Sequence, residues 1–337
     1  MNNIRAVELI EEQLHFINQT KLPLEEEMLV TDDFERIAIA IERLEIRGAP
    51  AIGVAAAYAL ALSLKNIQED KWQEVFEKAF KRLASTRPTA VNLFFALNEM
   101  KDVYNHFKGT KDLRSRLFQK AISIHNDDIN LCDRIASNGL NIFTHKVRVL
   151  THCNAGALAT GGDGTALNVI RKAFENGFIE HVYSDETRPL LQGSRLTAWE
   201  LQKYGIPFSM NTDSTAAFLM QQNKIDIVIT GADRIAINGD SANKIGTYNL
   251  AVLCHYHKIP FYIAAPTTTI DKKCLDGNEI KIEQRDKKEL THFGSKQITL
   301  DSYPAYCPAF DVTPNSLITA IITEKGIHKP PFDFLHV

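Results

Sequence analysis

The sequence predicts an α/β protein in two parts, a mainly helical part over residues 1–125 and a parallel sheet covered by helices over residues 126–337. The first part carries apolar residues at helical spacing. From residue 147 onward, short apolar runs alternate with helical patterns, which is typical of βαβ units. A chain of 337 residues also exceeds the usual size of one hydrophobic core, so two packed units are expected.

The helical part opens with a short hairpin-like stretch. Apolar spacing then predicts helices over residues 32–44, 51–64, 71–83, 91–104 and 118–143. The most apolar stretch, residues 49–64, is interrupted by Gly53 and is shorter than the roughly 18 apolar residues of a membrane span. We therefore expect a buried helix there, and no membrane association.

The second part alternates strands and helices. Strands are predicted at residues 147–151, 181–184, 208–211, 227–230 and 261–265. The intervening helices are predicted at residues 164–176, 194–204, 215–222 and 247–258. In parallel sheets, ligands bind beyond the carboxyl ends of the strands, and the motifs described below fall at those ends.

Composition excludes several functional classes. The formal net charge of -3 gives no general attraction to nucleic acid or to anionic membranes, so an anionic ligand requires a local site. The five cysteines are widely spaced, odd in number and free of a CxxC pair, which favours a reducing, cytoplasmic location over a disulfide framework or a structural zinc site. The histidines show no metal-ligand spacing, so we expect no metal and no cofactor.

The first motif is THCNAGALATGGDGT, residues 151–165, where a strand ends in a glycine-rich turn before a helix. Such a turn lets a phosphate approach the backbone and the helix N-terminus. A helix N-terminus and nearby basic groups can also lower a thiol pKa, which makes Cys153 a candidate reactive cysteine. An ordinary strand-to-helix turn with an inert buried cysteine would explain the same residues.

The second motif is SDETRPLLQGSRLTAWE, residues 184–200, which follows another predicted strand. Arg188 or Arg195 could bind a phosphate in bidentate fashion, and Gln192 could bind a sugar hydroxyl. A surface loop of ion pairs is the alternative.

The third motif is ITGADRIAINGDSANKIG, residues 229–246. It places Asp233 at the end of an apolar strand and Lys244 after a polar loop, just before a helix. This order suits a carboxylic acid near sugar hydroxyls and a lysine that neutralises a phosphate or polarises an oxygen. Helix capping is the alternative role for Asp233.

Two arginine segments in the helical part complete the candidate site. They are IRGAPAIG, residues 46–53, and STRPTAVN, residues 85–92. Each places an arginine, Arg47 or Arg87, just before a predicted helix start, so guanidinium and helix N-terminus could converge on one anion.

Together, these five segments and PAFDVTPNSLITAIITEKG, residues 308–326, resemble the family of methylthioribose-1-phosphate isomerase. That family is related to ribose-1,5-bisphosphate isomerase and to regulatory subunits of a translation initiation factor exchange complex. The likeness covers nearly the whole chain. It implies a helical N-terminal extension, a Rossmann-like C-terminal domain and a homodimer.

The resemblance also implies roles for individual residues. It places the catalytic cysteine at Cys153 and the catalytic aspartate at Asp233. The substrate would be held by Arg47, Gly48, Ala49, Arg87, Gln192, Asn243 and Lys244. Two positions depart from the family pattern, the pair Gly162-Asp163 and Cys307. Because Asp163 is close in sequence to the catalytic turn, we expect its charge to disfavour a phosphate at the 5-position of the sugar.

The implied activity is an aldose–ketose isomerisation of methylthioribose 1-phosphate to methylthioribulose 1-phosphate in methionine salvage. A cyclic sugar 1-phosphate cannot open spontaneously, so Cys153 and Asp233 would carry protons, and the sequence does not choose between a hydride shift and an enediolate. Three alternatives stay open: an isomerase of 5-deoxyribose 1-phosphate, an isomerase of ribose 1,5-bisphosphate, and a non-catalytic regulatory subunit like those of the initiation factor.

Overall fold

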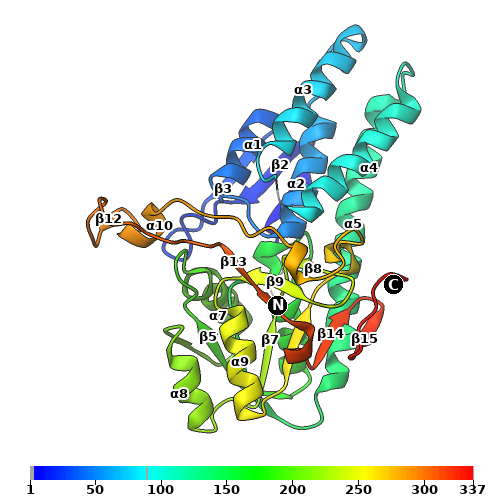
Figure 1. Ribbon diagram of the computed structural model, residues 1–337. Coiled ribbons are helices and arrows are strands. Elements are labelled where there is room, and N and C mark those ends of the chain that lie inside the picture. The colour runs from blue at the N-terminus through cyan, green and yellow to red at the C-terminus, as the bar shows by residue number, and fades with distance from the viewer. Residues whose placement is uncertain (1–3, 89, 337) are drawn as a thin grey trace.

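The computed structural model describes residues 4–88 and 90–336, and it confirms the predicted α/β class with a mostly parallel sheet. Helices gather at one end of the molecule, and the sheet with its covering helices forms the other end (Figure 1). Helix α5 (Leu113–Gly139) runs from one end to the other. It begins five residues earlier than predicted.

The helical end starts with an antiparallel sheet, β1 (Val7–Ile10), β2 (Gln13–Ile17) and β3 (Met28–Thr31), as the hairpin-like pattern predicts. The helices that follow are α1 (Phe34–Glu42), α2 (Ala49–Leu62), α3 (Trp72–Ala84) and α4 (Val91–Phe107). Helix α2 is apolar on all sides and is buried from Ala51 onward, packed against α4 and α5. The predicted buried helix at this position is confirmed. No helix in the described residues is long and apolar enough to cross a membrane.

The central sheet has the strand order β15-β14-β10-β7-β4-β5-β6. Its strands are β4 (Val147–Thr151), β5 (Ile179–Asp185), β6 (Phe208–Asn211), β7 (Ile227–Thr230), β10 (Phe261–Ala264), β14 (Ala320–Thr323) and β15 (Gly326–His328). All neighbours pair in parallel except β14 and β15. The chain builds outward from β4 through β5 to β6, then returns to β7 on the other side of β4. This topological switch places the ends of β4 and β7 side by side, the usual position of a ligand in such sheets.

The connections between the strands are helices, as predicted. They are α6 (Ala166–Glu175), the π-helical turn η4 (Gly193–Thr197) continued by α7 (Ala198–Tyr204), α8 (Thr215–Gln221) and α9 (Thr247–His257). Their buried faces pack on the sheet through residues such as Val169, Leu201 and Leu250.

The third motif does not form a plain polar loop. Instead, β9 (Ser241–Lys244) pairs with β8 (Arg234–Ile235) on one side and with β13 (Phe310–Thr313) on the other, in a small antiparallel sheet. The chain between β10 and β13 contains α10 (Lys288–Thr291), β11 (His292–Phe293) and β12 (Lys296–Gln297), which project away from the rest of the molecule (Figure 1). The sequence pattern had predicted none of these elements.

The proposed boundary at residue 125 falls inside α5. This helix packs on α2 and α4 at one end and on α6 and β14 at the other. A division into residues 1–125 and 126–337 therefore stays a proposal, with α5 shared between the two parts.

Candidate active site

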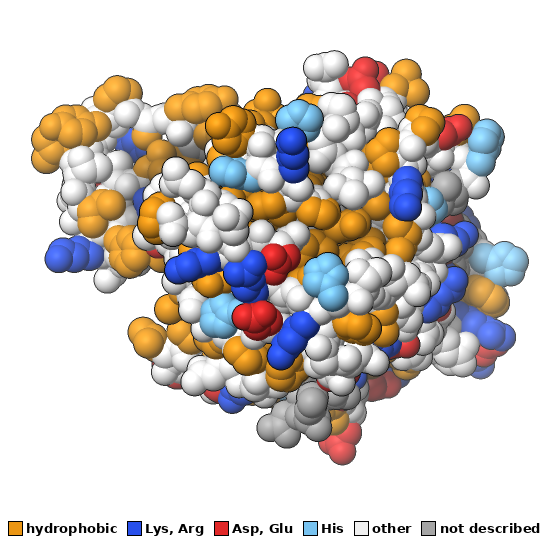
Figure 2. All heavy atoms as spheres, turned by 90° about the horizontal axis from the view of Figure 1, so that it is seen from below, with side chains coloured by type: hydrophobic (Ala, Val, Ile, Leu, Met, Phe, Trp, Pro, Cys, Tyr) orange, Lys and Arg blue, Asp and Glu red, His pale blue; other side chains and the backbone are white. Residues whose placement is uncertain are grey.

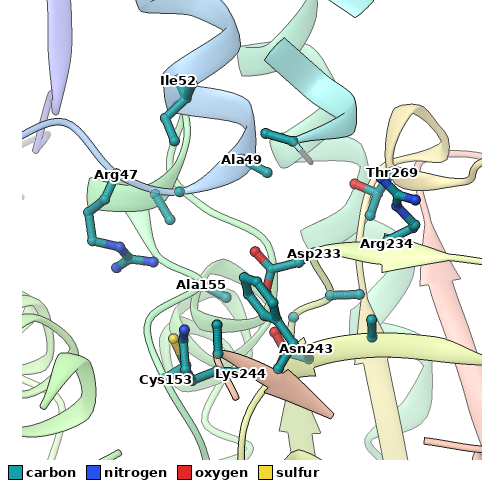
Figure 3. A pocket seen from close by; sticks show the side chains of 18 of the residues that line it. Arg47, Ala49, Ile52, Cys153, Ala155, Asp233, Arg234, Asn243, Lys244 and Thr269 are labelled. Carbon is teal, nitrogen blue, oxygen red and sulfur yellow. The ribbon is translucent and has the colours of Figure 1, made fainter. Parts of the chain in front are cut away.

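The nine residues to which the family resemblance gives catalytic or substrate-binding roles all line one pocket between the two parts of the molecule. These residues are Arg47, Gly48, Ala49, Arg87, Cys153, Gln192, Asp233, Asn243 and Lys244. Figure 3 shows Arg47 reaching down from the start of α2 toward Cys153 and Lys244, with Asp233 and Asn243 beside them. The pocket opens where β4 and β7 end, because Cys153 follows β4 by two residues and Asp233 follows β7 by three.

Cys153 is buried and has the left-handed backbone angle φ 61°. Burial raises the pKa of its thiol, and the nearby charge of Asp233 acts in the same direction. The positive charges of Arg47 and Lys244, with a hydrogen bond from the backbone of Asn154, oppose this rise. A thiol in this environment keeps its proton at neutral pH and can donate it.

Asp233 is held by its backbone N–H, which donates to the Ala242 carbonyl of β9 at 2.9 Å. Burial raises the pKa of its carboxyl group, while the charges of Lys244, Arg47 and Arg87 lower it. Two proton-carrying groups therefore share one pocket and one set of cations.

Two of the cations have no carboxylate partner among the described residues. Within the described chain, the Arg47 guanidinium donates to Asn154 alone, to its Oδ1 at 2.8 Å and its carbonyl at 3.1 Å. The Lys244 ammonium lies 4.4 Å from the centre of the Phe310 ring, and burial lowers the pKa of Lys244. Two cations that form no ion pair and lie at least half-buried attract an anion, and phosphate is the anion that suits such a pair.

The start of α2 adds hydrogen-bond donors. Its N-cap is Gly48, which has φ 90° and no side chain to accept a hydrogen bond. The first N–H groups of α2 therefore face the pocket without a capping acceptor. A Cβ atom at Gly48 would lie 2.3 Å from the Ala159 carbonyl, so only glycine fits this close approach.

Arg87 is placed differently from Arg47. Helix α4 begins at Val91, four residues after Arg87. The Arg87 guanidinium lies 3.5 Å from the Glu283 carboxylate, and Arg285 also pairs with Glu283 at 2.8 Å. Residues 280–283 and 285 line the pocket, and the sequence gave no periodic or motif signal for them.

Gln192 and Asn243 bring amide groups into the pocket. The Gln192 Oε1 is buried without a hydrogen-bond partner among the described residues, and Asn243 donates to the Thr247 hydroxyl at 3.0 Å. An unpaired buried amide oxygen is costly unless a ligand donates to it. A hydroxyl-bearing ligand would satisfy Gln192.

Three expectations were wrong. Arg195 does not face the pocket, because its guanidinium donates to the carbonyls of residues 19, 20, 22 and 190. Arg188 stacks over the Phe293 ring and is not among the residues that line the pocket. Asp163 pairs with Arg5 and Arg171, each at 3.0 Å, so its charge is neutralised and does not reach the pocket.

The sequence pattern did not predict the role of Glu200, a buried acid that binds the turn after Cys153. Glu200 is fully buried, and burial raises its pKa to about 7. Its carboxylate accepts from the Asn154 side chain at 2.8 Å and from the Ala157 N–H at 2.7 Å. Glu200 belongs to the second motif, but an acid inside a helical pattern gave no sign of its burial.

One cluster has the composition of a metal site. His152, Asp185 and Asp213 place possible ligand atoms near one another. However, His152 Nδ1 lies 3.0 Å from Asp185 Oδ2 and its Nε2 lies 2.9 Å from the Ile245 carbonyl, so both ring nitrogens already have partners. The geometry is that of a hydrogen-bonded pair joining the Cys153 turn to the Lys244 strand.

Comparison with known proteins gives consistent matches. The chain matches the initiation factor 2 subunit family over residues 45–330. A methylthioribose-1-phosphate isomerase from Desulfitobacterium hafniense (strain Y51) is 51% identical, over 98% of this chain and 97% of its own length. A protein of the same name from Desulforamulus reducens is 47% identical, over 95% of this chain and 94% of its own length.

Solved structures agree. The 5-methylthioribose 1-phosphate isomerase of Pyrococcus horikoshii OT3 superposes with a TM-score of 0.92 at 42% identity, covering 97% of this chain and 93% of its own. A structure described as the translation initiation factor eIF-2B delta subunit from A. fulgidus has a TM-score of 0.87 at 40% identity, covering 97% of this chain and 96% of its own.

Proposed function

The chain belongs to the initiation factor 2 subunit family, and from this premise we propose that its pocket performs the reaction for which its relatives are named. The protein is an aldose–ketose isomerase that converts methylthioribose 1-phosphate to methylthioribulose 1-phosphate. The observation that carries the proposal is the convergence of Cys153 and Asp233 with Arg47 and Lys244 in one pocket.

The substrate fits the charges of the pocket. The 1-phosphate would be held by the Arg47 guanidinium, the Lys244 ammonium and the N–H groups at the start of α2. Gln192 and Asn243 would bind sugar hydroxyls, and Gly48 and Ala49 would let the phosphate approach the backbone. Arg87 would bind a sugar hydroxyl while it stays paired with Glu283.

The chemistry requires two proton transfers. The ring oxygen must gain a proton when its bond to C1 breaks, and the C2 hydroxyl must lose one as C2 becomes a ketone. The hydrogen on C2 moves to C1, so no atom is gained or lost overall. Cys153 and Asp233 are the two proton carriers beside the phosphate cations, and we assign these transfers to them.

The regulatory-subunit alternative explains less of the pocket. A non-catalytic module would not need a buried thiol, a partly exposed carboxyl group and a buried lysine without a carboxylate partner in one place. The experiment is a panel of methylthioribose 1-phosphate, 5-deoxyribose 1-phosphate and ribose 1,5-bisphosphate, with a nucleotide-binding assay in parallel. An isomerase turns over at least one sugar phosphate, whereas binding of nucleotide without any turnover would favour the regulatory reading.

We further propose a cytoplasmic homodimer with a Rossmann-like catalytic part. The strand order on either side of β4 and β7 supports the Rossmann-like description. Apolar side chains gather on the projecting segment, at the left in Figure 2. Exposed ones there include Phe293, Leu300 and Tyr306, and a second copy would cover them. Light scattering of the purified protein tests the dimer, and a monomer mass would overturn it.

A further inference from the structure

The backbone of Cys153 is in a conformation that it would not adopt unaided. Its φ of 61° lies in the left-handed region, which a residue with a Cβ atom enters at a cost and keeps only when its surroundings enforce it. The residue is also buried, so its N–H and carbonyl both need partners inside the protein. Two threonine hydroxyls provide these partners.

Thr187 binds the N–H side of Cys153. The Cys153 N–H donates to Thr187 Oγ1 at 2.8 Å, and that hydroxyl donates its own hydrogen to the Asp185 carbonyl at 3.1 Å. Thr187 is itself left-handed, with φ 65°, and its N–H donates to the Asp213 carboxylate at 2.7 Å. The hydroxyl is thus fixed with its lone pair toward Cys153.

Thr197 binds the carbonyl side. Its hydroxyl donates to the Cys153 carbonyl at 2.6 Å and accepts from the Asn154 side chain at 3.3 Å. Thr197 ends the π-helical turn η4, an irregularity that often marks functional sites. The same turn follows Gln192, so η4 serves two sides of the pocket.

We propose that the hydroxyls of Thr187 and Thr197 form a clamp that holds Cys153 left-handed and aims its thiol into the pocket. Neither threonine lines the pocket, so both are positioning residues that act through Cys153. Both are buried, with 0% and 1% of their surface exposed. Each hydroxyl donates one hydrogen bond and accepts another. The inference rests on the proposed role of Cys153 as a proton carrier.

The clamp also explains a feature of the thiol. A hydrogen bond from the Asn154 backbone to the Cys153 sulfur lowers the pKa of the thiol. If Cys153 relaxed to an ordinary backbone conformation, that hydrogen bond would be lost. The thiol would then become harder to ionise.

The test compares isosteric and conservative substitutions. Thr187→Val and Thr197→Val keep the shape of the side chain but remove the hydroxyl, whereas Thr187→Ser and Thr197→Ser keep the hydroxyl. Thr313→Val is the matched control, because Thr313 is equally buried and its hydroxyl has no partner in the described part of the chain. For each protein, kcat and KM on methylthioribose 1-phosphate are measured. The pH dependence of Cys153 alkylation by iodoacetamide is followed by peptide mapping.

The clamp predicts that each valine variant loses about 10- to 100-fold in kcat, the scale expected when a reacting group is displaced by about an ångström. The KM of the valine variants should stay within about threefold of the wild-type value, and the midpoint of their Cys153 alkylation should move to higher pH. The serine variants should show wild-type kcat and a wild-type alkylation midpoint. Native kcat and alkylation profiles in the valine variants would overturn the clamp, as would equal losses in the serine variants. If one valine variant fails to fold, the other tests the same clamp.

Measuring Cys153→Ser in parallel separates this inference from the proposed function. Native turnover in Cys153→Ser would remove the proposed role of Cys153 whatever the threonine variants show. An inactive Cys153→Ser together with fully active valine variants would leave the function standing and remove only the clamp.

Discussion

At the reacting centre, burial and charge act in opposite directions on the pKa values of Cys153 and Asp233. Burial raises both, and the shared cations Arg47 and Lys244 lower both. A phosphate dianion bound to those cations would compensate their charge, so both pKa values should rise further in the complex. Both groups should therefore hold their protons more tightly once the substrate is bound.

The first prediction concerns these two groups. Cys153→Ser and Asp233→Asn should each lower kcat by about two to four orders of magnitude, the range for loss of general acid–base catalysis. The control is Cys274→Ser, since the Cys274 sulfur donates to the Asp276 carbonyl and a serine can keep that bond. Steady-state kinetics and circular dichroism check the result. Near-native turnover in a folded Cys153→Ser or Asp233→Asn protein would remove the assignment.

A second prediction concerns the buried lysine. Lys244→Ala should weaken binding of methylthioribose 1-phosphate at least about tenfold, because a buried phosphate would lose a charge-assisted hydrogen bond. Lys281→Ala, which removes an exposed lysine from the same pocket, serves as the control. Calorimetric titration measures both. Unchanged affinity in Lys244→Ala would mean that this ammonium does not reach the phosphate.

At the scale of elements, α5 fixes the glycine-rich turn after Cys153. Asp128 accepts from the Gly161 N–H at 2.6 Å, and His125 Nε2 lies 2.9 Å from the Gly161 carbonyl. Burial raises the pKa of Asp128 to about 6, although hydrogen bonds from Gly161 and Gly162 oppose the rise. The buried carboxyl group therefore makes the folded state sensitive to pH.

The sign of that sensitivity follows from proton binding. Between the unfolded pKa of 3.8 and the folded value of about 6, the folded protein binds more protons at Asp128 than the unfolded chain. Its contribution to stability is therefore full below pH 3.8 and falls as pH rises toward 6, by roughly 3 kcal/mol. In urea unfolding, the stability of the wild type relative to Asp128→Asn should decline over that interval. A constant difference would show that Asp128 does not titrate in this way.

Most elements of the second part could be predicted because their pattern is local. The strands and helices from residue 147 to residue 265 follow the predicted order, with bounds shifted by a few residues. The small sheet of β8, β9 and β13 was missed because it joins segments about 70 residues apart through short strands. Arg195 was misassigned for a related reason: proximity to a strand end does not determine which way a side chain points.

The same limit applies to the candidate site. Its nine predicted residues came from motifs and from resemblance, and the structure brings them together because β4 and β7 are neighbours. The residues at 280–285 lie in an irregular segment without periodicity, and their approach to Arg87 depends on the whole fold. Sequence alone could not pair Arg87 with a glutamate 196 positions away.

At the scale of the whole molecule, Glu283 links the two parts across the pocket. Burial opposes its ionisation, but the hydrogen bond from Arg285 and the charges of Arg87 and Arg285 outweigh burial and lower its pKa. Glu283 is therefore anionic and keeps those two arginines neutralised. In the described part of the chain, the pocket cations without a carboxylate partner, apart from the exposed Lys281, are Arg47 and Lys244, which is enough for one phosphate.

A prediction about substrate choice follows from this charge balance. The kcat/KM for methylthioribose 1-phosphate should exceed that for ribose 1,5-bisphosphate by at least about tenfold. A second phosphate would find no unpaired cation and would be repelled by the negative charge in the pocket. Glu283→Gln should narrow that preference by releasing Arg87 and Arg285. Glu279→Gln, in the same segment but outside the pocket, should leave it unchanged. If Glu283→Gln keeps the wild-type ratio, Glu283 does not set the preference.

The most direct measurement of the central claim is phosphorus-31 NMR of methylthioribose 1-phosphate incubated with the purified protein. The account predicts that the aldose 1-phosphate signal is replaced by that of the ketose 1-phosphate with wild-type protein. It also predicts that the signal stays unchanged over the same time with Cys153→Ser. A substrate signal that persists with the folded wild-type protein, or that converts equally fast with Cys153→Ser, would contradict the account.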